Sequence, residues 1–504
     1  MKYIFLLISL FTFNFLQAQV TGVIKDAAGE PIPGANVFWM NTTNGVTTNE
    51  DGNFSIHKPA RSHMLVVSFI GFENDTIHVD KGNQQLDIVL REGVELSEVN
   101  VVTRKLGTMK LRTSVMNEDM ISSAELTRAA CCNLGESFVT NPSVDVSYSD
   151  AATGAKQIKL LGLSGTYVQM MTENIPNFRG AAAPYGLGYV PGPWMQSIQV
   201  SKGSSSVKNG YESITGQINV EFKKPQLPEA DWVSANLFAS STNRYEANAD
   251  ATVKLSKRWS TSLLAHYENE TKSHDSNDDG FVDIPRVEQY NVWNRWAYMG
   301  DHYVFQAGIK ALHETRNSGQ IAHGNTPSHD LYEIGIKTNR YEAFTKNAYI
   351  FDKEKNTNLA LILQGTLHNQ DANYGRKLYD VDQSNFYASL LFETELNKQH
   401  SLSAGLSFNY DGYDQNYRLT NQAEEGLTKK FVKESVPGAY VQYTFNLNDQ
   451  LMLMGGIRGD YSNEYGFFVT PRAHVKYNPN EYLHFRVSAG KGYRTNHVLA
   501  ENNY

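Results

Sequence analysis

The chain has 504 residues and is rich in aromatic side chains and glycine, with 28 Tyr, 24 Phe and 38 Gly but only 2 Cys. This composition suits many β-strands and turns better than it suits helices. The formal net charge is −8, which gives no hint of nucleic-acid binding, since a nucleic-acid-binding protein favours a basic stripe. We therefore expect a mainly β protein with no nucleic-acid partner.

The first 18 residues have the pattern of an export signal. Lys2 gives a charged start, Ile4 to Leu16 form an apolar stretch too short to span a bilayer as a helix, and Ala18 is small enough for cleavage before Gln19. An uncleaved membrane anchor is the alternative. After residue 18 no apolar run approaches 18 residues, so we expect no transmembrane helix, although membrane-spanning strands remain compatible with the sequence.

Residues 19–92 predict a small β-sandwich, because short β-rich runs alternate with turn sequences. Six strands are expected, at 20–25, 36–40, 53–56, 65–69, 76–79 and 85–90. The strings VTGVIKDAAGEPIPGANVFW and TNEDGNFSI closely resemble the carboxypeptidase-regulatory-like domain, which precedes membrane receptors in Bacteroidetes-type bacteria. The segment has no zinc-ligand pair, so the resemblance implies no peptidase activity.

Residues 93–107 form an extended, β-branched linker that resembles a TonB box. The box consists of Leu96, Ser97, Glu98, Val99, Asn100, Val101 and Val102. An exposed strand of this kind binds a partner by adding to the edge of its sheet. One more strand of the sandwich is the alternative interpretation.

Residues 108–224 resemble the plug domain of TonB-dependent outer-membrane receptors. A helical start is expected over Ser122–Val139, and the diagnostic string SIQVSKGSSS is followed by GQINV. Three positions depart from the family pattern: Leu161-Gly162 replaces Arg-Gly, Glu173-Asn174 replaces Asp-Gly, and Gln199 replaces Glu. Charges at these positions help lock plug to barrel in relatives, so the sequence leaves the locking contacts of this chain undetermined.

Residues 225–504 predict part of a transmembrane antiparallel β-barrel. Apolar residues alternate with small or polar ones, as in Leu402, Ala404, Leu406, Phe408 and Tyr410, which is the period that a strand between lipid and water requires. Short connections alternate with longer ones, which we expect at 271–287, 315–340, 370–383 and 412–434. About 13 strands are expected here, whereas the family barrel has 22. We therefore expect that about 190 residues are missing and that the chain is C-terminally truncated.

The loop after the third barrel strand carries a calcium-like pattern. Oxygen-bearing side chains alternate at Asp275, Asn277, Asp279 and Asp283, and Gly280 permits the sharp turn. The twelfth position is Arg286 instead of the bidentate Glu, so an ordinary surface loop is an equal alternative to a weak structural Ca²⁺ site. We expect no other cofactor.

The sulfur-bearing residues of the plug predict a soft-metal site. The candidates are Cys131, Cys132, Met170, Met171 and Met195. Soft sulfur ligands favour Cu(I), and the stretch CCNLGESFVTNPSVDV resembles a receptor branch that handles copper or heavy metals. Here the two cysteines are expected on the plug helix and the Met pair in an outward apex over Tyr167–Pro176. The alternative is that these are core residues only.

Together the resemblances imply an outer-membrane import receptor that works with the TonB–ExbB–ExbD complex, sits in outer-membrane lipid and has a surface lipoprotein as a candidate partner. Copper or another metal complex is the expected cargo. No catalytic constellation is present, so we expect no enzyme activity. Two other classes stay open: a plugged barrel that acts as an adhesin or signalling receptor, and a surface hydrolase.

Overall fold

The computed structural model describes residues 19–26, 29–40, 45–49, 51–58, 63–69, 72, 75–79, 85–90, 108–110, 114–128, 132–139, 141–225, 232–321, 331–420, 426–447, 450–480 and 483–501. The chain divides into two compact units, Met1–Leu106 and Gly107–Tyr504.

The first unit is a β-sandwich of two sheets. One sheet has the order β4-β1-β7 and the other β3-β2-β5-β6. The strands are β1 (Gln19–Lys25), β2 (Asn36–Trp39), β3 (Gly45–Thr47), β4 (Asn53–His57), β5 (Met64–Ser68), β6 (Asp75–His78) and β7 (Gln85–Val89). Strand β3 was not expected, because three residues are too few to show an alternating pattern. The core between the sheets contains Trp39, whose indole N–H donates to the carbonyl of His57 at 2.9 Å.

The second unit begins with a mixed α/β region that forms the plug. Its six-stranded sheet has the order β13-β12-β15-β14-β9-β8, and β10 and β11 form a separate hairpin. The strands are β8 (Thr108–Lys110), β9 (Asn117–Ser122), β10 (Val144–Asp150), β11 (Ala155–Leu160), β12 (Val168–Thr172), β13 (Ile175–Pro176), β14 (Met195–Lys202) and β15 (Gly216–Phe222). Strands β12 and β15 are parallel, and the crossover between them contains most of the plug loops.

The plug helices are shorter than the sequence predicts. Instead of one helix over Ser122–Val139, the structure has α2 (Ser123–Arg128) and the 3₁₀ turn η1 (Leu134–Phe138). The side chain of Asn133 accepts from the N–H of Glu136 and so starts η1 as a separate element. The other 3₁₀ turns are η2 (Gly165–Tyr167), η3 (Gly180–Ala182), η4 (Gly192–Trp194) and η5 (Val207–Asn209).

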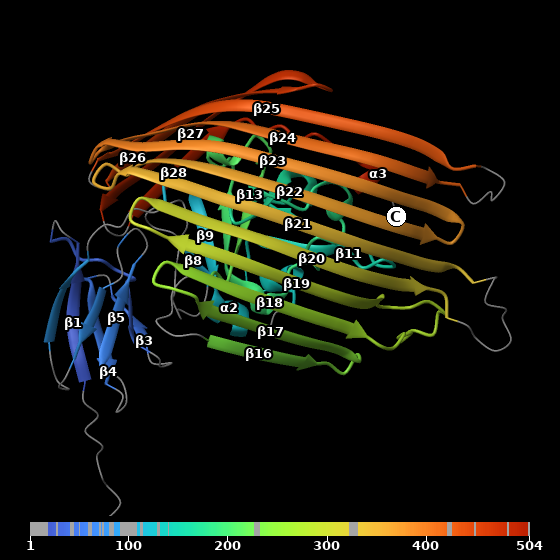
Figure 1. The fold of residues 1–504 in the computed structure, drawn as a ribbon, viewed down its shortest axis with the longest axis horizontal. Helices are drawn as coiled ribbons and strands as arrows, with labels where there is room; N and C mark the ends of the chain where they lie inside the picture. The colour runs from blue at the N-terminus through green and yellow to red at the C-terminus, as the bar shows by residue number, and fades with distance from the viewer. Residues whose placement is uncertain are drawn as a thin grey trace, which may run out of the picture. The chain divides into compact units, whose positions relative to one another are not determined.

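Thirteen antiparallel strands follow and pair in chain order from β16 to β28, which agrees with the predicted number. They are β16 (Trp232–Ala239), β17 (Arg244–Lys254), β18 (Trp259–Glu270), β19 (Arg286–Met299), β20 (Tyr303–Gly319), β21 (Glu333–Asp352), β22 (Thr357–Tyr374), β23 (Lys377–Asn397), β24 (His400–Arg418), β25 (Thr428–Leu447), β26 (Leu451–Ser462), β27 (Gly466–Asn480) and β28 (Leu483–Gly490), before a short helix α3 (Val498–Glu501). Figure 1 shows this sheet curving around the plug.

The two ends of the sheet differ in their connections. At one end, the short-turn end, consecutive strands are joined by two to four residues; at the other, the long-loop end, the connections include 271–285, 320–332 and 419–427. Two of the expected long loops are wrong: residues 370–383 are strand except for Gly375-Arg376, and most of 412–434 is strand. Polar residues there resemble loop sequence, but backbone pairing with neighbouring strands keeps them in the sheet.

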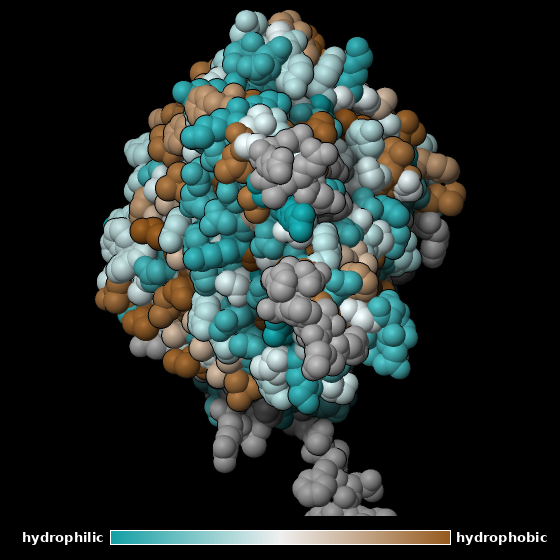
Figure 2. Space-filling view, turned by 90° about the vertical axis from the view of Figure 1, so that its right-hand side faces the viewer, coloured by the Kyte–Doolittle hydropathy of each residue, from teal (hydrophilic) through white to brown (hydrophobic). Residues whose placement is uncertain are grey.

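The sheet is polar on its inner face and apolar on its outer face. On β19 the inward Gln289, Asn291 and Arg295 are buried, whereas the outward Val292 and Trp296 are exposed. Figure 2, which faces the long-loop end, shows hydrophilic residues across the centre and hydrophobic ones toward the rim. Period two with apolar residues outside is the pattern of a strand that faces lipid.

Two aromatic pairs on the outer face of β18 and β19 bracket an apolar band. Trp259 packs on Tyr298 near the short turns, and Tyr267 packs on Tyr290 eight residues further along β18. Eight residues span about 26 Å along a strand. Because barrel strands are tilted, this length corresponds to a height of about 20 Å along the barrel axis, which is close to the roughly 25 Å apolar band of outer-membrane barrels. Within the described residues, no helix is long and apolar enough to cross a membrane.

Candidate functional site

The inner face of the sheet meets the plug through buried ion pairs, and the first lies at the turn between β12 and β13. Glu173 and Asn174 form this two-residue turn, both with positive φ (50° and 61°). Asn tolerates this left-handed backbone better than most residues, so it replaces the glycine of the family pattern. The Glu173 carboxylate lies 2.6 Å from Nη2 of Arg295 on β19 and 3.6 Å from Nζ of Lys346 on β21. Glu173, which stands where the family pattern has Asp, therefore keeps a negative charge at this position, and this charge pairs with the barrel.

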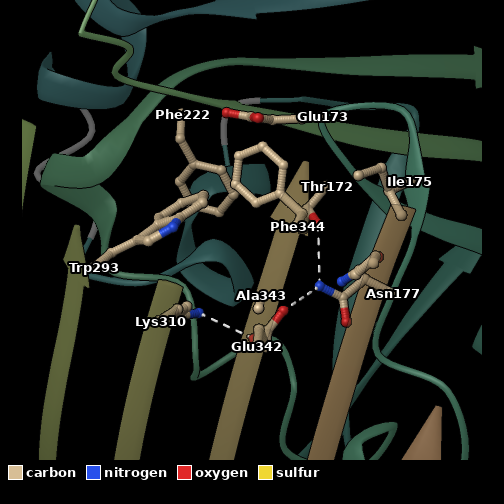
Figure 3. Close-up of a pocket in the computed structure, with 11 residues that line it drawn as sticks. Thr172, Glu173, Ile175, Asn177, Phe222, Trp293, Lys310, Glu342, Ala343 and Phe344 are labelled. Atoms are coloured by element: carbon tan, nitrogen blue, oxygen red, sulfur yellow. Dashed lines mark hydrogen bonds and ion pairs between the residues drawn. The ribbon is translucent and has the colours of Figure 1, made fainter. Parts of the chain in front are cut away.

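At this first junction the rings of Phe222, Trp293 and Phe344 lie beside the Glu173 side chain (Figure 3). The Arg295 guanidinium lies 4.6 Å from the ring centre of Trp293 and donates to the carbonyl of Lys223 at 2.7 Å. Trp293 in turn meets Phe222 of the plug edge-on at 4.6 Å. A small cavity of about 400 Å³ lies beside these rings and is lined by both plug and barrel residues. Charge and apolar area thus fix the end of the plug to β19.

The side chain of Asn177 forms a polar bridge beside this cavity. Its Nδ2 donates to Oε2 of Glu342 at 2.9 Å, and its Oδ1 accepts from Arg340 at 2.6 Å. Both partners are on β21. The bridge holds the chain after β13 against the barrel wall, next to the Glu173 turn.

A second junction is centred on Arg179, which is buried between plug and barrel. Its guanidinium lies 2.9 Å from Glu212 of the plug and 2.8 Å from Asp411 of β24. Arg494, after the last strand, lies 3.4 Å from the same Glu212 and 3.0 Å from Glu501. Burial opposes the charge on Arg179, but the two nearby carboxylates raise its pKa well above the ordinary value.

A third junction involves the segment of the diagnostic string SIQVSKGSSS. Arg472 on β27 donates to the carbonyls of Ser205 at 3.2 Å and Ser206 at 3.0 Å. Nearby, Lys208 lies 3.3 Å from Glu393 of β23, and this carboxylate raises the pKa of the lysine. Sequence reasoning could not identify the barrel partners at these junctions, because each plug residue and its barrel partner lie more than 100 residues apart and carry no shared motif.

The position of the expected apex is wrong. The Glu173 turn contacts Arg295 and Lys346, which lie near the short-turn ends of their strands, so Tyr167–Pro176 does not point toward the long loops. Instead, the carbonyls of Gly188 and Thr153 accept from Gln289 and Arg316 near the long-loop ends of β19 and β20. The spacing of turn residues cannot tell which turn of a plug faces outward.

A large cavity of about 1050 Å³ lies at this long-loop end between the plug and strands β16 to β20. Its centre is Arg244 on β17, which lies 2.9 Å from Glu136 of η1, 2.7 Å from Glu246 and 2.9 Å from Glu268. Burial raises the pKa of Glu136, but Arg244 outweighs it and the net shift is downward.

The structure separates the candidate soft-metal ligands. Cys132 lines the large cavity, and Met170 lines a neighbouring cavity of about 760 Å³ that shares Lys156 and Leu187 with it. Met171 follows Met170 on β12, so their side chains point to opposite faces of the sheet. Met171 and Met195 are fully buried in the plug. Cys131 lies outside the described residues. Burial raises the pKa of the Cys132 thiol.

In the calcium-like loop, the carboxylates face the loop backbone. Asp275 accepts from the N–H groups of Asp279 and Gly280, and Asp283 accepts from that of Ser276 at 2.7 Å. The hydrogen bonds from Ser276 lower the pKa of Asp283. Gly280 has φ of +82°, as the expected turn requires. Among the residues that the structure describes, no group of three or more His, Cys, Asp or Glu side chains converges to hold a metal, so calcium binding stays a prediction.

The TonB-box residues 96–102 lie outside the described residues. A barrel sheet that is polar inside and apolar outside, with a separate domain fixed in its lumen by ion pairs, defines a plugged outer-membrane barrel.

Three family profiles match consecutive parts of the chain. The CarboxypepD_reg-like domain matches residues 20–102, the TonB-dependent receptor plug domain residues 110–217, and the TonB-dependent receptor-like β-barrel residues 325–504. The chain belongs to the TonB-dependent receptors, whose barrels sit in the outer membrane.

Relatives and solved structures agree with this family. The TonB-dependent receptor SusC of Bacteroides thetaiotaomicron is 28% identical over 245 residues, which is 46% of this chain and 24% of that protein. Receptor P39 of Formosa agariphila is 40% identical over 100 residues, which is 19% of this chain and 10% of that protein. The match thus spans a quarter or less of each of these relatives.

Among solved structures, the alcaligin receptor FauA of Bordetella pertussis has a TM-score of 0.62 at 14% identity and covers 78% of this chain and 67% of its own. The copper transporter OprC has a TM-score of 0.61 at 12% identity, and the match covers 77% of this chain and 64% of that protein. At these identities the likeness concerns the fold.

Proposed function

We propose that the receptor imports a scarce cargo across the outer membrane and that TonB drives the import. The observation that supports this function most directly is the plug itself, which is held in the lumen by buried ion pairs at Glu173 and Arg179. Breaking such pairs costs several kcal/mol, so the lumen opens only with an external energy source. The TonB–ExbB–ExbD complex is the source that the family resemblance implies.

Deletion of residues 96–102 tests the coupling. Cells that carry this deletion are expected to bind cargo at the surface and to lose uptake, because the partner has no strand to pair with. The matched control is deletion of the calcium-like loop residues 275–281, which leaves the box intact. Normal uptake by the box deletion would show that transport does not depend on this segment. A receptor that carries no cargo in either form, and whose adhesion the deletion leaves unaffected, would favour an adhesin or signalling role.

We propose further that the cargo is copper, free or chelated. Cys132 and Met170 support this cargo, because they place two soft sulfur ligands on the walls of adjoining cavities. Met171 and Met195 are packed in the core and serve the fold. Copper accumulation under copper limitation is the test: Met170→Leu keeps the volume and removes the ligand, with Met195→Leu as the matched control. Equal accumulation by wild type and Met170→Leu would remove Met170 from the site.

A further inference from the structure

The large cavity at the long-loop end is lined by more acidic than basic side chains. Four carboxylates and three basic side chains line it: Glu136, Glu268, Glu270, Glu314, Lys156, Arg244 and Arg316. A fifth carboxylate, that of Glu246, does not line the cavity but lies 2.7 Å from Nε of Arg244. The field inside the cavity therefore favours positive charge.

Every basic group of this cavity is already paired with a carboxylate. Arg244 contacts Glu136 and Glu268 at 2.9 Å, Arg316 contacts Glu314 at 3.0 Å, and Lys156 lies 3.9 Å from Glu136. An anionic ligand would have to compete with these carboxylates for each cation. Binding of an anion is therefore disfavoured at this site.

The carboxylate of Glu270 differs from the others that line the cavity, because none of the basic groups pairs with it. Glu270 lies directly opposite Arg244 in the β17–β18 ladder, yet the guanidinium turns toward the other carboxylates, and Glu270 has no ion-pair partner within the described part of the chain. A half-buried carboxylate at the wall of a cavity supplies a site for one positive charge.

The second unsatisfied group is an acceptor as well. Gln289 is 1% exposed and lines the cavity, and its Nε2 donates to the carbonyl of Gly188 and to Oε2 of Glu314. Because both neighbours can only accept, the orientation of the amide is fixed, and its Oε1 finds no hydrogen-bond partner among the residues that the structure describes. A buried acceptor of this kind costs about 1–3 kcal/mol unless a ligand or water donates to it. The Glu270 carboxylate and Oε1 of Gln289 thus offer two acceptors to a ligand that carries N–H donors.

We infer that this cavity binds an organic cation, namely an ammonium or guanidinium group carried by the cargo. Glu270 pairs with the charge, and Oε1 of Gln289 accepts one of its N–H groups. The exposed ring of Tyr148, which already lies 5.4 Å from Lys156, offers the cation a π face. The inference rests on the proposed import function for its biological meaning and adds the charge of the molecule that is recognised.

Binding of agmatine, which carries both an ammonium and a guanidinium group, tests the inference on the intact receptor purified in detergent. Calorimetry is expected to show binding of agmatine and none of succinate, an anion of similar length. Glu270→Gln should weaken agmatine about tenfold or more, as expected for a hydrogen bond to a charged group, and Gln289→Leu about two- to tenfold. Asp371→Asn, which removes an exposed carboxylate on β22, is the matched control and should leave the affinity unchanged.

Succinate binding as tightly as agmatine would overturn the inference, and so would full agmatine affinity in Glu270→Gln. This measurement needs neither TonB nor copper, so its outcome is independent of the import assays. Agmatine binding without copper uptake would refute the copper cargo and leave the cavity assignment standing. Copper uptake without agmatine binding would refute the cavity assignment and leave the copper cargo standing.

Discussion

The Glu173 junction makes a quantitative prediction about how firmly the plug is held. In Glu173→Gln the carboxylate that faces Arg295 at 2.6 Å and Lys346 at 3.6 Å loses its charge. Both Glu173 and Arg295 are almost fully buried, so solvent screens the pair little. At an effective dielectric constant of about 20, each close pair contributes about 4 kcal/mol, and removal of one member of a buried pair typically costs about 3–5 kcal/mol. We expect the plug to lose about 3–5 kcal/mol of stability.

Denaturant unfolding followed by tryptophan fluorescence measures this loss, since Trp194 and Trp293 lie 6.3 Å apart across the plug–barrel interface. Asp301→Asn is the matched control, because Asp301 pairs with Arg258 at 2.9 Å but on the exposed surface. That variant should lose at most about 1 kcal/mol. The double variant Glu173→Gln, Arg295→Met should regain part of the loss, because it leaves no unpaired guanidinium. A loss below about 1 kcal/mol in Glu173→Gln would refute the lock.

Four further predictions concern the membrane, the coupling and the metals. Leu406→Arg on the outer face of β24, where Leu406 is 58% exposed, should cost about 2–4 kcal/mol in refolding into lipid if the position lies near the midplane; no loss would place it outside the bilayer. Val99→Pro should abolish uptake and keep cargo binding, because proline removes a backbone donor; normal uptake would put the box elsewhere. Cu(I) affinity should increase about tenfold for each unit by which the pH is raised, as long as the pH stays below the pKa of the Cys132 thiol, because the thiol must lose its proton to bind. A flat pH profile in the wild type, or the same pH dependence in Cys132→Ser as in the wild type, would exclude the thiol. Calcium should bind weakly, with Kd on the order of 0.1–1 mM, and Asp279→Ala should remove the heat in calorimetry; the absence of heat in the wild type would leave an ordinary surface loop.

Local pattern was sufficient for the architecture. Alternation with a period of two revealed the barrel strands, including the outward Leu406, because a strand between lipid and a polar lumen must alternate along its whole length. The plug and the N-terminal sandwich were predictable from strings that specify tight turns and close packing. These features depend on neighbours in the sequence, so the sequence records them directly.

Element ends were less predictable. The helix expected over Ser122–Val139 divides into α2 and η1, because Asn133 caps a new turn and the chain around Cys132 pairs with the loop at Pro191. Strands β22 and β23 continue through polar residues up to Gly375, because their backbones pair with each other whatever side chains they carry. Tertiary pairing outweighs local propensity at such positions.

The sequence by itself determined the order of the parts, the number of barrel strands and the residue types that face lipid. Only the tertiary structure decided which charges meet: it brings Glu173 to Arg295, Arg179 to Asp411, and Arg244 to Glu136. Each of these pairs joins residues more than 100 positions apart. A charge inside the lumen is stabilised only by the groups that folding brings within a few ångströms, and no local pattern encodes that distance.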